Sequence, residues 1–148
     1  MKRFLGTREY IYSLSLFLVL IDQYSKYIAT KYLPYNISIK FIPGLINLRK
    51  VNNTGAAFSL LEDSTFYLGI LSLLASILLV ILIYKKSYYF RIWEAISIAF
   101  LLSGSLGNGI DRWRLGYVID FIELIPINFP IFNFADISIN FAIVFFFI

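Results

Sequence analysis

The 148-residue sequence contains no cysteine and no histidine. Without cysteine the chain has no disulfides, thiolate nucleophiles or cysteine metal sites, and without histidine it has no imidazole ligands and no triad with a histidine base. Any catalysis must therefore use Asp, Glu, Lys, Ser or Tyr side chains. We expect neither a metal ion nor any other cofactor.

Charged residues are also scarce, at 15% of the chain, whereas hydrophobic residues make up 59%. The hydrophobic share of soluble domains is roughly 45–50%, and a chain of this size cannot bury so much apolar surface in one core. The mean hydropathy of +0.77 agrees with this. The composition predicts an integral membrane protein with a single domain, residues 1–148.

The formal net charge is +4. The basic residues are dispersed and flank apolar segments instead of forming a stripe, so we expect no nucleic-acid partner. They indicate topology instead. Basic residues precede the first apolar segment and also lie in the short connection between the second and third apolar segments. By the positive-inside rule, both regions are expected on the cytoplasmic side.

Four apolar segments predict four transmembrane helices, at residues 11–29, 66–84, 92–110 and 135–148. The first three are about 28 Å long as helices, close to the roughly 30 Å of a hydrocarbon core, whereas the fourth spans only about 21 Å. The first segment lacks a small-x-small cleavage site and carries Asp22 and Lys26. We therefore interpret it as a retained helix and not as a cleaved signal peptide.

The connection between the first two helices has a different pattern. Ile37, Ile39 and Phe41 alternate with polar residues, and a mixed segment follows Pro43-Gly44. This alternation predicts a small antiparallel sheet on the extracytoplasmic side. The fold class is thus an all-α membrane protein of four transmembrane helices with a small β-sheet cradle between helices 1 and 2. In the connection 112–134, the glycine and prolines allow only short helices.

The predicted topology places every aspartate on the outer half of the protein. Asp22 and Lys26 lie on one helix face at i and i+4, and residues 108–112 bring an amide, a carboxylate and a guanidinium to one turn. Ionisable groups near hydrocarbon usually face a protein interior or a water-filled cavity. The pattern predicts one polar site near the outer surface, although charges that merely anchor helix ends remain an alternative for each aspartate.

Asp120 and Asp136 differ from the others because apolar residues surround each of them and no basic residue is adjacent. Two such carboxyls, once brought together, would share a proton, so that one acts as a base toward water and the other as an acid. This pair is the most plausible hydrolytic machinery in the chain. Glu123 could supply a third carboxylate, but we interpret it as a surface group of a loop.

Five motifs resemble those of lipoprotein signal peptidase, or signal peptidase II, a family of bacterial intramembrane aspartic peptidases. They occur in the family's order: DQYSK at 22–26, NTGAAFS at 53–59, GNGIDR at 107–112, GYVIDF at 116–121 and FNFAD at 132–136. The small residues Gly55, Ala56 and Ala57 would let a substrate backbone approach closely, or form an ordinary tight turn.

The resemblance implies that Asp120 and Asp136 are the catalytic dyad of an endopeptidase that removes the signal peptide from prolipoproteins, before a diacylglyceryl-modified cysteine. It implies a bacterial inner-membrane protein, in contact with membrane lipid and acting as a monomer, with its site near the extracytoplasmic face. Globomycin and myxovirescin are the expected inhibitors. The residues that would bind substrate or support the site are Asn53, Gly107, Asn108, Asp111, Arg112, Asn133, Asp22 and Lys26.

Three alternatives remain at this level. A small four-span transporter or channel subunit would place an ionisable residue near the middle of a span, facing its pathway. An intramembrane protease of the Gly-x-Gly-Asp kind is a second alternative, although residues 107–111 miss that pattern by one residue. The third is a membrane assembly factor without catalytic activity.

Overall fold

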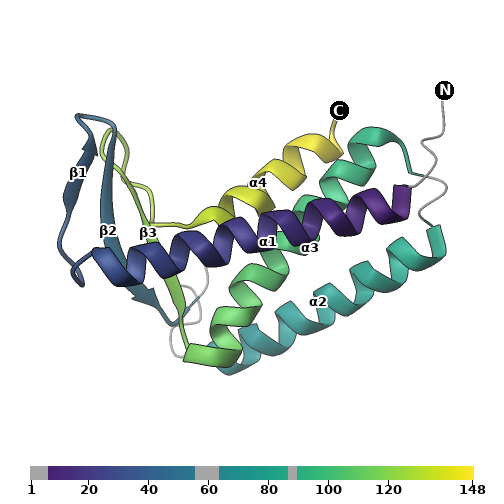
Figure 1. The fold of residues 1–148 in the computed structure, drawn as a ribbon, viewed down its shortest axis with the longest axis horizontal. Coiled ribbons are helices and arrows are strands. Elements are labelled where there is room, and N and C mark those ends of the chain that lie inside the picture. Colours follow the sequence, from purple (N-terminus) through teal and green to yellow (C-terminus); the bar gives the residue numbers. More distant parts are fainter. Residues whose placement is uncertain (1–6, 56–63, 87–89) are drawn as a thin grey trace.

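The computed structural model describes residues 7–55, 64–86 and 90–148. Four helices lie side by side, and a small sheet covers one end of them (Figure 1). The helices are α1 (Thr7–Tyr32), α2 (Thr65–Lys86), α3 (Ile92–Leu115) and α4 (Phe134–Phe146). All four helices that the sequence predicts are therefore present, and α3 makes the most extensive contacts with the other three.

The helices are apolar on the outside and partly polar on the inside. Phe66, Leu74 and Leu78 of α2 are more than half exposed. In contrast, the buried side chains include Ser15, Asp22, Lys26, Ser97 and Ser103. This distribution suits a helix bundle whose solvent is lipid, because lipid solvates apolar side chains whereas polar groups need partners within the protein.

Of the described helices, α2 alone is long and apolar enough to span a membrane by its length and composition, and α4 is a shorter apolar helix. The buried polar side chains of α1 and α3 lower the mean hydropathy of these helices. Their outer faces remain apolar, as at Leu16 and Ile92.

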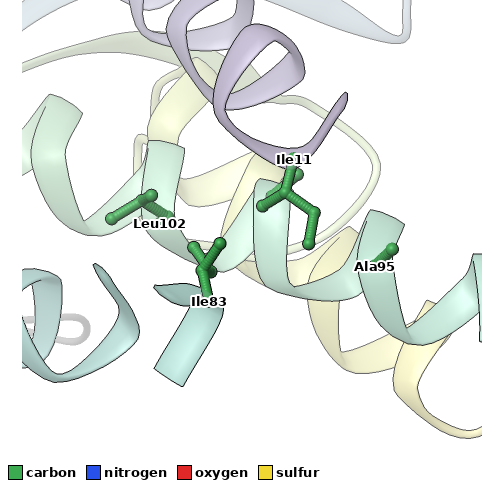
Figure 2. Close-up of a cluster of buried hydrophobic side chains, with 5 residues drawn as sticks. Ile11, Ile83, Ala95 and Leu102 are labelled. Atoms are coloured by element: carbon green, nitrogen blue, oxygen red, sulfur yellow. The ribbon is translucent and has the colours of Figure 1, made fainter. Parts of the chain in front are cut away.

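A cluster of small and branched side chains packs α1 and α2 against α3. Ile11, Ile83, Ala95 and Leu102 gather there (Figure 2), together with Ala99. The two alanines let the backbones approach, and Ser15 Oγ donates a hydrogen bond to the Ala99 carbonyl at 3.1 Å. Small residues and hydroxyl bonds of this kind are typical of helix interfaces in membranes.

The contact between α3 and α4 is closer still. A Cβ atom added to Gly104 would lie 2.6 Å from the carbonyl oxygen of Ala135, and one added to Gly107 would lie 2.6 Å from an Asp22 carboxylate oxygen. Real Cβ contacts are essentially never so short. These two glycines therefore set the distance at which α1 and α4 lie against α3.

The sheet has three antiparallel strands in the order β1 (Ile39–Ile42), β2 (Ile46–Asn53) and β3 (Val118–Leu124). The hairpin of β1 and β2 confirms the sheet that the sequence predicts between the first two helices. The expectation was incomplete, however, because β3 comes from the connection after α3. Its pairing with β2 places Val51 opposite Asp120 and Asn53 opposite Val118.

The sequence does not reveal β3 because four consecutive residues, Val118 to Phe121, are buried on both faces of the strand. A strand covered on both faces lacks the alternation by which a half-buried strand is found. Glu123 also lies on β3 and not in a loop, which corrects the interpretation above. Its carboxylate pairs with Arg49 of β2 at 3.0 Å.

Candidate active site

Asp120 projects from the middle of β3 and is 1% exposed. Two asparagine side chains hold its carboxyl group from opposite sides. Asn53 Nδ2, from the end of β2, donates to Oδ2 at 2.9 Å, and Asn133 Nδ2 donates to Oδ1 at 2.6 Å. The antiparallel pairing of β2 and β3 is what brings Asn53 to this position.

Asp136 is positioned by the start of α4. Asn133 is the N-cap residue, and its Oδ1 accepts a hydrogen bond from the Asp136 backbone at 3.0 Å. In return, Asp136 Oδ2 accepts from the Asn133 backbone at 3.1 Å. This reciprocal arrangement is a capping box, which fixes the first turn of the helix. Asn108 Nδ2 of α3 donates to the other oxygen of Asp136 at 2.8 Å.

Asn133 therefore contacts both carboxyl groups and is completely buried. It also donates to Asn108 Oδ1 at 3.1 Å, which links the two asparagines to each other. A fully bonded network of this kind has few alternative arrangements, because each lost contact would leave a buried polar group without a partner. Asp120 and Asp136, 16 positions apart in the sequence, are thus fixed within one hydrogen-bond network.

The electrostatic environment of Asp120 favours its protonated form. Burial, and to a lesser extent the negative charge of Asp136, raises the pKa of Asp120 to about 7, although the hydrogen bonds from Asn53 and Asn133 oppose the rise. Burial raises the pKa of a carboxyl because the charged form loses its hydration. Asp120 can therefore hold a proton near neutral pH, as a general acid must.

Arg112 of α3 brings a positive charge to the same place. One of its terminal nitrogens donates to the Gly55 carbonyl at 3.1 Å. Its Nε is buried and has no hydrogen-bond partner among the described residues. Gly55 is buried and its N–H donates to Asn53 Oδ1 at 2.9 Å, so this turn connects Arg112 with the site. Ala56 and Ala57, which the sequence also indicates, lie outside the described residues.

Lys26 is the centre of a second network of ion pairs and hydrogen bonds, which joins the first network at Asn108. Its side chain is 2% exposed and its Nζ lies 2.9 Å from Asp22 and 3.0 Å from Asp111. It also donates to Asn108 Oδ1 at 3.0 Å. Asp22 in turn accepts from the Ala135 backbone at 2.9 Å. Asp22 and Lys26 thus connect α1 to α3, to the start of α4 and, through Asn108, to Asp136.

Gln23 is part of this second network, which the sequence did not indicate. Its Nε2 lies 3.2 Å from Asp22 Oδ2, 3.2 Å from the Gly107 carbonyl and 3.1 Å from Asp111 Oδ1. Glutamine is common on exposed helix faces, so its type alone carries no signal. Its place inside the first motif, between the network residue Asp22 and Lys26, was the available hint.

A cavity of about 550 Å³ opens beside the two carboxyl groups. Apolar side chains of α2, α3 and α4 form much of its wall, and the segment before α4 covers another part. Its lining includes Leu71, Ala75, Leu101, Ile139, Phe129 and Phe132 and the polar residues Asn53, Asn108, Arg112, Asp120, Asp136 and Asn140. Of the residues that the sequence predicts for the site, five line this cavity.

The other five predicted site residues do not line the cavity. Gly107, Asp111, Asn133, Asp22 and Lys26 take part in the networks or packing beneath it, not in the lining. Within the described part of the chain, no group of three Asp or Glu side chains is arranged to hold a metal ion. The chemistry that this arrangement supports is acid and base catalysis by two carboxyls.

The fold is also found in solved structures. Two of them, each described as a bacterial membrane enzyme, superimpose with TM-scores of 0.85 and 0.82 at 33% sequence identity. The alignments cover 98% and 99% of this chain and 87% and 93% of the two structures. The chain therefore has the fold of a membrane enzyme, with a buried pair of carboxyls.

The family described as signal peptidase (SPase) II matches residues 14–148. Lipoprotein signal peptidases of Synechococcus sp. (strain RCC307) and Enterococcus faecalis are 49% and 38% identical to the chain. The alignments cover 93% and 91% of this chain and 91% and 83% of those proteins. The chain belongs to the signal peptidase II family, which consists of proteases, and the transporter and assembly-factor alternatives are set aside.

Replacing Lys26 with methionine should destabilise the protein strongly. The substitution keeps the length of the side chain but leaves Asp22 and Asp111 buried without their cation, which costs about 3–5 kcal/mol. The thermal unfolding midpoint in detergent should fall. Lys31→Met is the matched control on the same helix, because Lys31 is exposed and its midpoint should stay near the native one. Equal midpoints for the two variants would contradict the assigned role of Lys26.

Proposed function

We propose that this chain is an aspartic endopeptidase that removes the signal peptide of prolipoproteins by cleaving before a diacylglyceryl-modified cysteine. The observation that carries the proposal is the pair of buried carboxyls, Asp120 and Asp136, held by shared asparagines beside a largely apolar cavity. The family supports signal peptide removal. The aspartic mechanism rests on the geometry of the pair.

In the proposed mechanism, Asp136 is the base and Asp120 the acid. Asp136 takes a proton from water as the water oxygen bonds to the scissile carbonyl carbon, and Asp120 gives its proton to the carbonyl oxygen. The resulting diol returns a proton to Asp120 while the carbon–nitrogen bond breaks and Asp136 protonates the leaving nitrogen. The products are a carboxylic acid and the free amine of the cysteine, and both carboxyls regain their starting states.

Three side chains assist these steps. Asn53 and Asn133 hold the Asp120 carboxyl in place, so that its orientation costs no reorganisation during the reaction. The buried and unpaired Nε of Arg112 would donate a hydrogen bond to an oxygen of the substrate. No metal or other cofactor has a role in this mechanism, because the two carboxyls and a water molecule complete the proton transfers.

We propose that all four helices cross the bacterial inner membrane. The basic residues Arg8, Lys85, Lys86 and Arg91 lie at the ends of helices away from the sheet, which the positive-inside rule assigns to the cytoplasm. The sheet and the carboxyl pair then lie near the extracytoplasmic face. Because α4 has 13 residues, about 20 Å, the bilayer would thin locally around it.

The cavity is the proposed site for the substrate's acyl chains and for the inhibitors globomycin and myxovirescin. Its apolar walls on α2 and α3 suit hydrocarbon, and the carboxyls beside them suit the peptide bond. All residues of the proposed mechanism come from one chain. We therefore propose that the protein acts as a monomer.

Asp120→Asn and Asp136→Asn should each abolish cleavage of a lipid-modified prolipoprotein while the protein stays folded. An amide can neither release nor accept the proton that each step requires. The assay is a gel shift with purified protein, and the unfolding midpoint of each variant checks its fold. Glu123→Gln is the matched control, because Glu123 lies on the same strand and pairs with Arg49. Near-native turnover in either asparagine variant would refute the dyad.

The cleavage rate should fall as the pH rises through about 7. Asp120 acts in its protonated form, and its pKa of about 7 means that this form is lost above neutral pH. Asn53 donates to the charged form and lowers the pKa of Asp120. In Asn53→Leu the decline should therefore move to higher pH, which kcat measured across the pH range would detect. A decline at unchanged pH in this variant would count against Asp120 as the acid.

Removing the diacylglyceryl group should make the prolipoprotein a very poor substrate. Each buried methylene of the acyl chains contributes about 0.8 kcal/mol, so most of the binding free energy comes from the lipid. Part of it is used to place the scissile bond against the carboxyls, so kcat should fall together with affinity. Matched substrates with and without the lipid measure this in one detergent. Comparable rates would show that the lipid is not recognised.

A further inference from the structure

Asn140 of α4 is an exposed polar side chain in a helix that is otherwise almost entirely apolar. It lies four residues after Asp136 and therefore on the same helix face. Both residues line the cavity. The mechanism above gives Asn140 no role.

One hydrogen bond fixes the orientation of the Asn140 amide. Its Nδ2 donates to the Asp136 backbone carbonyl at 2.9 Å. The reverse orientation would place two oxygens against each other, since a carbonyl oxygen cannot donate. Oδ1 is therefore the atom that turns away from this contact, and no described residue donates a hydrogen bond to it.

Much of the wall of the cavity that Asn140 lines is apolar. Ile139, next to it in sequence, and Leu101 of α3 both line the cavity. If a ligand shields Asn140 Oδ1 from water without donating a hydrogen bond to it, the ligand binds more weakly. Any substrate that fills the cavity is therefore favoured if it brings an N–H or O–H group to Oδ1.

The acyl chains and ester groups of a diacylglyceryl substituent carry no such donor. The peptide backbone does, because a peptide that is cleaved here must be extended at the scissile bond, and extended backbone has no hydrogen bonds within its own segment. At membrane depth each of those N–H groups needs a protein partner. Oδ1 of Asn140 can supply one.

The spacing indicates which N–H group this is. Four residues of helix separate Asn140 from Asp136 by about 6 Å, and two residues of extended peptide cover about 6.6 Å. α4 runs away from the sheet (Figure 1), so Asn140 lies deeper in the proposed membrane than the carboxyl pair. The signal peptide is the part of the substrate that continues in that direction.

We propose that Asn140 is a substrate-binding residue whose Oδ1 accepts a hydrogen bond from a backbone N–H of the substrate's signal peptide, about two residues before the scissile bond. The inference rests on the proposed function. The proposal predicts that the enzyme binds one backbone N–H group of the signal peptide, independently of the lipid.

The test uses lipid-modified peptide substrates in which the backbone nitrogen of each of the four residues before the cysteine is methylated in turn. Native protein and Asn140→Leu, which has nearly the same shape but no acceptor, are compared by kcat/KM. We expect one methylation, at the second or third residue before the cysteine, to cost the native enzyme about tenfold, the value of one hydrogen bond of this kind. The same methylation should cost Asn140→Leu less than about twofold.

Ser138→Ala is the matched control. Ser138 Oγ donates to the Phe134 carbonyl of the same helix at 2.9 Å, as Asn140 does to Asp136, but Ser138 does not line the cavity. Its methylation profile should equal the native one. If the native enzyme cleaves but Asn140→Leu keeps every methylation penalty, the role of Asn140 is refuted and the proposed function stands. If the native enzyme cleaves none of the lipid-modified peptides, the proposed function itself is refuted.

Discussion

The ion pairs of the buried Lys26 ammonium group with Asp22 and Asp111 hold the site together. In lipid, no hydrophobic effect drives helices together, so small-residue packing and polar contacts must hold them. Lys26 of α1 pairs with Asp111 of α3 and with Asp22, whose other oxygen accepts the backbone N–H of Ala135 in α4. Three helices thus meet around one charge.

That charge also acts on the proposed catalytic pair through Asn108. The Oδ1 of Asn108 accepts from both Lys26 and Asn133, so its Nδ2 must face the other way, toward Asp136. These contacts alone therefore fix the orientation of the Asn108 amide. The supporting network and the carboxyl pair are therefore one continuous structure, in which the position of Asp136 depends on the packing of α1.

The two carboxyls are held differently, which suits different roles. Asp120 lies on a strand that is buried on both faces and receives its hydrogen bonds from amide side chains. Asp136 lies in the first turn of α4, where its Oδ2 accepts a hydrogen bond from the N-cap backbone. Two chemically identical groups therefore have different surroundings, which is consistent with the acid and base roles proposed for them.

From the sequence we could predict the four helices, the hairpin of β1 and β2 and the residues around which the site is built. These follow from local pattern: long apolar segments, alternation near Ile39, the i and i+4 spacing of Asp22 and Lys26, and aspartates within apolar sequence. The tertiary structure was needed to show that β3 joins the sheet, that Gln23 enters the Lys26 network and that Asn133 contacts both carboxyls. The physical reason is that periodicity and composition report whether a residue faces lipid or protein, whereas a hydrogen bond depends on the direction of single atoms, which is set only when distant segments pack together.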